Sequence, residues 1–150
     1  MSDSVLKVIP MESKFMPTQE AQDRAEEFFS SLFPEADEIS IDISEEVIFV
    51  DQGENLERVL CPACGATLEM DWWVEVMNVA AEGKFSILDV QLPCCGLKTT
   101  LNDLRYEWPA GFARFVMEAR NPGACELDDQ SKQQLESILG CKLRIVNALY

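Results

Sequence analysis

Four cysteines carry the clearest chemical signal in this 150-residue sequence. Cys61 and Cys64 lie in the segment Cys-Pro-Ala-Cys-Gly, and Cys94 and Cys95 lie about thirty residues later in Pro-Cys-Cys-Gly. Two thiolates separated by two residues can bind one ion only if the backbone turns tightly between them. A proline that fixes φ and a glycine that tolerates positive φ favour such a turn. We therefore expect the four cysteines to bind one metal ion.

The second cysteine pair departs from the regular pattern. In a regular second turn the first cysteine would stand at Leu92, so only Cys95 occupies a regular position and Cys94 must supply the missing ligand. Neighbouring side chains diverge in extended backbone, so a shared ion requires a bend, which the flanking proline and glycine allow. The open alternatives are a three-cysteine site completed by water, a carboxylate or Cys125, a vicinal disulfide or redox pair, and buried thiols without a metal.

The segment 61–65 resembles the zinc knuckles of zinc-ribbon proteins, and the segment 93–96 resembles a degenerate second knuckle. The resemblance covers only these residues and points to no specific characterised family. It implies structural Zn²⁺ held by Cys61, Cys64, Cys94 and Cys95, in a zinc-ribbon-like module at about residues 58–101. Iron is the alternative ion.

Composition restricts the classes of protein to which the chain can belong. With 150 residues and 47% apolar content, we expect one domain spanning residues 1–150. The sequence has no histidine, which removes every mechanism that depends on imidazole. No segment has the length of a transmembrane helix or the pattern of a signal peptide, so we expect a cytoplasmic protein without a membrane partner. Thiols stay reduced in the cytoplasm, so the six cysteines do not indicate a framework of disulfide bonds. We expect Cys125 and Cys141 to be small, mostly buried side chains.

The net charge is −15 and is unevenly distributed. Residues 1–60 carry fifteen acidic and four basic side chains, and residues 35–57 carry nine acidic side chains and no basic one. Such a surface opposes nucleic-acid binding, for which counterion release is the main driving force. The acidic stretch is typical of a solvated face that keeps a protein soluble; the alternative is a docking surface for a basic partner protein.

The hydrophobic pattern predicts an α+β domain with a mainly antiparallel sheet covered by helices. The two segments 39–44 and 47–50 are expected at the centre of the sheet, as one strand or as a hairpin. A helix is favoured over a strand at 71–80, where one of two adjacent tryptophans should be in the core. The expected strands are 5–10, 39–44, 47–50, 85–92, 97–101 and 143–150, and the expected helices are 18–33, 71–80, 109–120 and 128–139.

One polar and aromatic cluster outside the cysteine motif could contact a partner, because arginine and tryptophan are enriched at binding hot spots. It lies in and after residues 102–108 and contains much of the positive charge of the second half of the chain. Ordinary surface pairing of these arginines with the acidic half is the favoured interpretation, and a contact surface is the alternative. The candidate residues of a partner surface are Arg105, Trp108 and Arg114 of this cluster, together with Glu45, Glu46 and Glu54 of the acidic stretch.

Two functions remain open from the sequence. The first is a non-catalytic protein-interaction or regulatory domain, similar in role to an inhibitor or adaptor, in which zinc holds the fold. The second is a metal-dependent or thiol-dependent enzyme that uses an open zinc position or a reactive Cys94 or Cys95. The first is favoured, and enzymatic activity stays undecided. The number of sulfur ligands distinguishes the two.

Overall fold

The computed structural model describes residues 3–123 and 126–150, so Cys125 lies outside the described residues. The elements in chain order are β1 (Ser4–Pro10), α1 (Gln19–Leu32), β2 (Glu38–Val50), β3 (Arg58–Leu60), α2 (Met70–Glu82), β4 (Asp89–Gln91), β5 (Lys98–Thr100), the short 3₁₀ helix η1 (Leu101–Asp103), β6 (Arg105–Glu107), β7 (Gly111–Arg120), α3 (Asp129–Leu139) and β8 (Leu143–Leu149). This content confirms the predicted α+β class.

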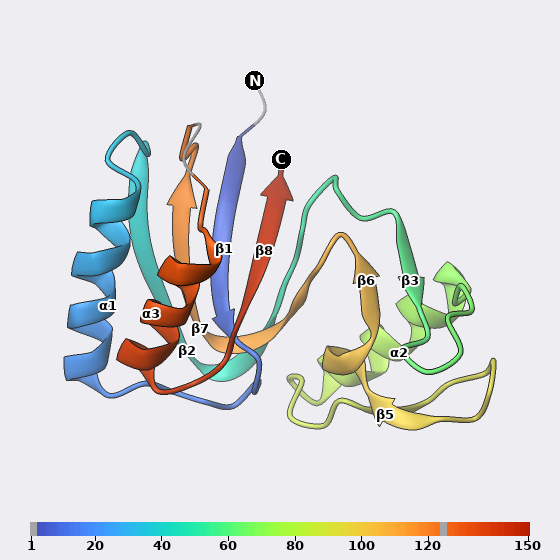
Figure 1. Cartoon of the computed structure of the whole chain (residues 1–150). Coiled ribbons are helices and arrows are strands. Elements are labelled where there is room, and N and C mark those ends of the chain that lie inside the picture. Colours follow the sequence, from blue (N-terminus) through green and yellow to red (C-terminus); the bar gives the residue numbers. More distant parts are fainter. Residues whose placement is uncertain (1–2, 124–125) are drawn as a thin grey trace.

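Four long strands form an antiparallel sheet in the order β2-β7-β1-β8 (Figure 1). Val8 in β1 lies opposite Met117 in β7 and Ile145 in β8. The first and last strands of the chain are therefore neighbours near one edge of the sheet, as the alternating segments 5–10 and 143–150 allow.

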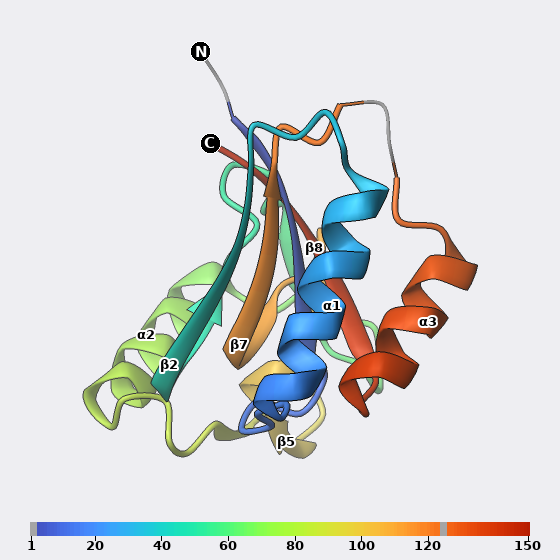
Figure 2. The same cartoon turned by 90° about the vertical axis from the view of Figure 1, so that its left-hand side faces the viewer.

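Helices α1 and α3 cover one face of this sheet (Figures 1 and 2). Each helix begins at a side-chain cap, at the residue where the sequence predicted its start: the Ala21 N–H donates to Thr18 Oγ1 at 3.2 Å, and the Ser131 N–H donates to Asp128 Oδ1 at 2.7 Å. The buried side chains between helices and sheet form one core, which we call the sheet core. It includes Ala25, Phe29, Leu135 and Leu139 from the helices and Leu6, Val8, Phe115 and Met117 from the strands.

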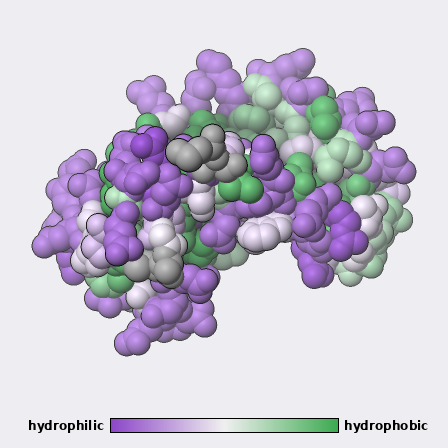
Figure 3. All heavy atoms as spheres, turned by 90° about the horizontal axis from the view of Figure 1, so that it is seen from above, coloured by the Kyte–Doolittle hydropathy of each residue, from purple (hydrophilic) through white to green (hydrophobic). Residues whose placement is uncertain are grey.

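The chain between β2 and β7 forms a second part, the metal module (residues 51–110), which lies beyond β8 in Figure 1. It contains helix α2 and two small antiparallel sheets, β3-β6 and β4-β5. Its own core gathers Val59, Leu68, Trp73 and Tyr106, and Phe112 of β7 joins it. Trp73 is buried and Trp72 half-buried, as expected for one core tryptophan of the pair. Seen from above, the surface of the molecule is indented on one side between its two ends (Figure 3).

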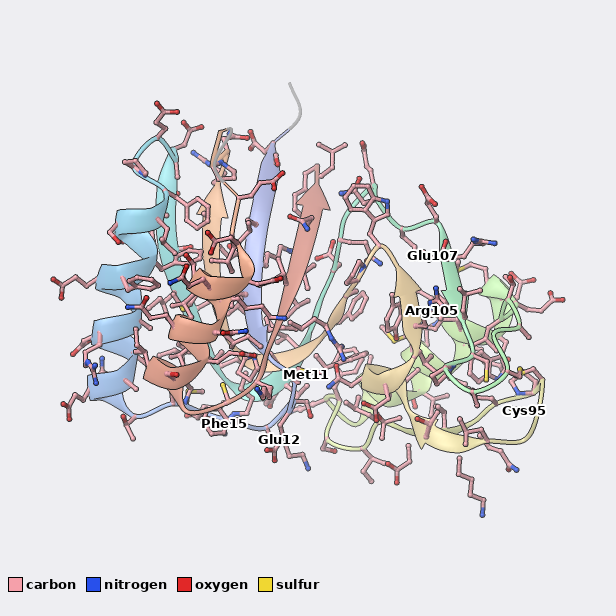
Figure 4. The ribbon with its side chains drawn as sticks, in the orientation of Figure 1. Met11, Glu12, Phe15, Cys95, Arg105 and Glu107 are labelled. Carbon is pink, nitrogen blue, oxygen red and sulfur yellow. The ribbon has the colours of Figure 1, made fainter. Side chains whose placement is uncertain are left out.

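A buried polar joint connects the two parts. The Arg144 guanidinium on β8 donates to the backbone oxygens of Asn102, at 2.9 Å, and Ala110, at 3.0 Å. The side chain of Asn102 donates to the Met11 carbonyl at 2.8 Å and accepts from the Phe112 N–H at 3.0 Å. Met11 lies at the base of the sheet, beside the module (Figure 4). The joint thus fixes η1 against the ends of three strands of the main sheet.

The predicted helix at 109–120 is wrong, because Gly111–Arg120 is strand β7. Phe112, Phe115, Val116 and Ala119 have helical spacing, but they lie in a strand that pairs with β2 on one side and β1 on the other. Both faces of β7 are largely buried, so apolar residues occur on both faces and the alternation of a half-exposed strand is lost.

Two further expectations about strands need correction. The segments 39–44 and 47–50 form one strand, β2, which is one of the two expected arrangements, with a register shift between Ile43 and Ile48; the expected central position is wrong, because β2 lies at the sheet edge. The predicted strand 85–92 is reduced to Asp89–Gln91, because residues after α2 continue in turns and Phe85 has a φ of 55°. Phe85 packs instead against Phe112, with ring centroids 5.4 Å apart.

Within residues 3–123 and 126–150, no helix has the length and apolar character needed to cross a membrane.

Candidate metal centre

The first cysteine turn connects β3 to the segment before α2. The Gly65 N–H donates to the Cys61 carbonyl at 3.0 Å, and the Cys61 N–H donates to the Ala66 carbonyl at 2.9 Å. Gly65 has a φ of 76°, a conformation that a side chain would oppose. Proline and glycine therefore shape this turn as the sequence predicted, with Cys61 and Cys64 at its two ends.

The second turn has the same backbone although its sequence differs. The Gly96 N–H donates to the Leu92 carbonyl at 3.0 Å, the Leu92 N–H donates to the Leu97 carbonyl at 2.9 Å, and Gly96 has a φ of 77°. Leu92 thus occupies the place that Cys61 has in the first turn, and each has only 1% of its surface exposed. Cys95 corresponds to Cys64, whereas Cys94 reaches the cluster from the position after the proline.

The four sulfur atoms converge on one point. Cys61 Sγ lies 3.7 Å from Cys95 Sγ, and Cys64 Sγ lies 3.6 Å from Cys94 Sγ. All four sulfur atoms lie within 4.8 Å of one another. Four thiolates arranged tetrahedrally at the usual zinc–sulfur distance of about 2.3 Å have sulfur atoms about 3.8 Å apart. The cluster therefore has the size and donor set that a tetrahedral metal ion requires.

The adjacent cysteines are not joined to each other. Cys94 Sγ and Cys95 Sγ are 3.9 Å apart, whereas a disulfide bond measures about 2.05 Å. Both side chains point to the same cluster, because the turn ending at Gly96 bends the backbone between them. Of the alternatives left open by the sequence, the vicinal disulfide is absent from this structure.

The protein environment shifts the pKa values of Cys61 and Cys94 in opposite directions. The backbone N–H groups of Cys64 and Ala63 each point at Cys61 Sγ, 3.4 Å away, and the Cys64 N–H contributes most to lowering the pKa of Cys61 to about 6. Desolvation and the neighbouring thiols raise the pKa of Cys94 to about 12. Four thiolates this close repel one another, so full ionisation of the cluster requires a bound cation.

The cluster lies at the surface of the module. Cys61 is buried, whereas Cys64, Cys94 and Cys95 are exposed, and Cys95 marks the far end of the module in Figure 4. Cys141, which was expected to be mostly buried, is half-buried beside the sheet core.

The residues expected on a partner surface do not form one patch. Arg114, Glu45 and Glu46 line one hollow, where the Lys84 ammonium is 3.2 Å from Glu46 and Arg114 Nε donates to the Ser44 carbonyl at 3.1 Å. Arg105 is exposed on β6, and Trp108, 44% exposed, follows that strand (Figure 4). Glu54 is exposed after β2, where its N–H donates to the Leu149 carbonyl.

Sequence reasoning missed a polar network on the sheet face opposite α1 and α3. The Lys7 ammonium, 7% exposed at its side chain, donates to the Tyr150 hydroxyl at 2.6 Å and to the Asp51 carbonyl at 3.0 Å. The Tyr150 hydroxyl donates to Asp51 Oδ1 at 2.9 Å. The available signal was a lysine inside an otherwise apolar strand, but its partners are 44 and 143 residues away. The network links the ends of β2 and β8 to β1.

Comparison with known proteins does not assign this chain to a family. The chain matches no protein-family model, no curated protein and no solved structure. What the structure itself supports is a cluster of four cysteines, on two turns of the same backbone form, that could hold a metal ion.

Proposed function

We propose that the chain is a zinc-binding protein in which the metal is structural, and that its role is a non-catalytic interaction with, or regulation of, another protein. The observation that carries this proposal is the convergence of Cys61, Cys64, Cys94 and Cys95, with sulfur separations of 3.6–3.9 Å for the close pairs. Four sulfur donors fill the four positions of a tetrahedral zinc ion. No position is then left for a water molecule or substrate, which is the difference between structural and catalytic zinc sites.

The surroundings of the cluster also favour a structural role. The cluster connects β3-β6, the start of α2 and the β4-β5 hairpin, and these elements are short: each of the four strands has three residues. Two-stranded sheets of this size are marginally stable by themselves. When bound, zinc supplies a cross-link that only the folded chain can form, so its binding energy becomes folding energy. Reduced thiols also suit a cytoplasmic location.

The competing interpretation as a thiol-dependent enzyme requires Cys94 or Cys95 to be free to react, whereas the sulfur atoms of both residues belong to the four-cysteine cluster. The net charge of −15 favours a basic protein as the partner and opposes nucleic acid.

Elemental analysis of protein purified without added metal tests the first half of this proposal. We expect one zinc ion per chain and retention of the fold when cadmium, which also binds four thiolates, replaces zinc. Affinity capture from native cell extract tests the second half, and both metal forms should retain the same protein. A partner lost on replacement with cadmium despite an intact fold would indicate that the metal itself acts in function.

A further inference from the structure

Helix α2 and strand β4 are the walls of a groove on the metal module, with a volume of about 360 Å³. One wall is a stripe along α2 that includes Trp72, Val76 and Val79, which are spaced three or four residues apart. The opposite wall includes Ile87 and Val90, and the fully buried Leu101 lies at the bottom. In Figure 2, α2 lies at the outside of the molecule, on the side of the sheet away from α1 and α3.

The groove exposes large apolar side chains to solvent. Val79 is 65% exposed and Ile87 is 71% exposed, the two highest values among the exposed large apolar side chains of the described residues. Only Trp73 is buried in α2, although most of that helix is apolar. Contiguous apolar surface bordered by polar residues is typical of sites at which proteins bind other molecules.

The charges around the groove select among the molecules that could bind there. Glu75 and Asp89 line its two walls, and α2 carries two further acidic residues, Asp71 and Glu82, and no basic one. The same sign of charge opposes a second copy of this chain, an anionic lipid surface and nucleic acid. A positively charged partner with apolar side chains complements both properties of the groove.

We infer that this groove binds an amphipathic helix with basic flanks from a partner protein; the inference rests on the proposed function as an interaction domain. The stripe from Trp72 to Ala80 covers eight residue steps of α2, a length of about 12 Å, which matches about two turns of a docked helix. Such a helix would place apolar residues at positions i, i+3 or i+4, and i+7 in the groove, with lysine or arginine facing Glu75 and Asp89.

The four clustered cysteines lie close in sequence to one end of each wall of this groove. Helix α2 begins at Met70, six residues after Cys64, and β4 ends at Gln91, three residues before Cys94. A bound ion therefore fixes the chain close to one end of each wall. A metal ion bound at the module surface would therefore shape the groove that recognises the partner, in addition to stabilising the module.

A display library of amphipathic helices, each about 14 residues or four turns long, tests the inference when it is selected against the metal-loaded full chain. Two variants measure the contribution of the groove: the double variant Val79→Ser with Ile87→Ser, and the matched control Val74→Ser. Val74 is also exposed on α2, at 46%, but does not line the groove. Valine and serine have similar helix propensity, so the changes in α2 should leave that helix intact. An unchanged circular dichroism spectrum and melting temperature confirm that each variant is folded.

We expect the selected helices to be basic, and their affinity to fall by at least about tenfold in the double variant and to stay unchanged in Val74→Ser. Glu75→Gln should weaken binding about threefold at low salt and have little effect at high salt. No enrichment, enrichment of sequences without basic residues, or binding that the double variant leaves intact would overturn the inference, as would dimerisation of the native chain that the double variant abolishes.

Capture from cell extract, run with the native chain and the double variant, separates this inference from the proposed function. A partner retained equally by both proteins would support the proposed function and place the docking surface elsewhere. A partner lost only from the double variant supports the groove, provided that a synthetic helix from that partner binds the native chain.

Discussion

The sheet with α1 and α3 and the metal module differ in the length of their elements and in the cysteines they contain. The sheet has antiparallel pairings of four to nine residues and a core in which Phe29, Phe115 and Leu135 are completely buried. The module has strands of three residues, a helix with one buried residue and four converging cysteines. The comparison leads to the expectation that apolar burial and long strand pairings hold the first part, whereas a metal cross-link supplements the core of the second part if the proposed ion is bound.

Metal removal should produce the largest difference in stability between the two parts. Zinc bound by four thiolates contributes on the order of 10 kcal/mol, so chelation or Cys61→Ala should unfold the module. Hydrogen exchange measured by mass spectrometry should show protection lost in residues 58–101 and largely kept in β1 and β7. Cys141→Ala is the matched control, because Cys141 lies outside the cluster. Equal protection of the module with and without metal would contradict this difference.

A substitution in the sheet core should lower the stability of the fold and leave the metal affinity of the module almost unchanged. Phe115→Ala removes a completely buried ring and should lower the free energy of unfolding by about 3–5 kcal/mol. The metal affinity of the folded protein should change little, because Phe115 belongs to the sheet core and not to the module core. Denaturant unfolding and competition with a chromophoric chelator measure the two quantities. Ile43→Ala, at a site 55% exposed, serves as control.

The two cysteine turns offer a sharper test within the module. Cys94→Ala removes one ligand and should reduce metal affinity by at least about 100-fold, more than the loss of an outer-sphere partner. The double variant Leu92→Cys with Cys94→Ala converts the second turn to the pattern of the first. Because both turns share the same backbone hydrogen bonds, the double variant should regain most of the affinity. Failure of this rescue, with the module still folded, would contradict the equivalence of Leu92 and Cys61.

The smallest expected effect concerns the network around Lys7. Burial alone would raise the pKa of Asp51, but the Lys7 ammonium and the hydrogen bonds from Tyr150 and Gly53 lower it below its usual value of 3.8. The ionised carboxylate therefore stabilises the folded state at neutral pH, and this contribution is lost as the pH falls below that value. Asp51→Asn should cost about 1 kcal/mol at pH 7. The difference from native protein should shrink below about pH 4 in urea unfolding series; a constant difference would argue against the network.

The sequence was most informative where one residue type determines local geometry. Thr18 and Asp128 mark helix starts, and the prolines and glycines of the cysteine turns mark the turns themselves. These signals act over a few residues, so no knowledge of tertiary contacts was needed to interpret them. The correct reading of Leu92 as the place of the missing cysteine follows from the same local pattern.

Features that depend on distant neighbours could not be predicted in the same way. Strand β7 resembles a helix because both its faces are buried, and that burial comes from elements elsewhere in the chain. The partners of Lys7 and the groove beside α2 likewise arise from contacts between segments far apart in sequence. Arg105 and Arg114, neighbours in a sequence cluster, lie in different parts of the fold for the same reason.

X-ray absorption spectroscopy of the purified protein at the zinc edge tests the central claim most directly. We predict a first shell of four sulfur atoms at about 2.3 Å and no lighter ligand. A shell of three sulfur atoms with one oxygen would contradict the assignment of all four cysteines, and a folded protein without bound transition metal would contradict the claim that a metal holds the module together.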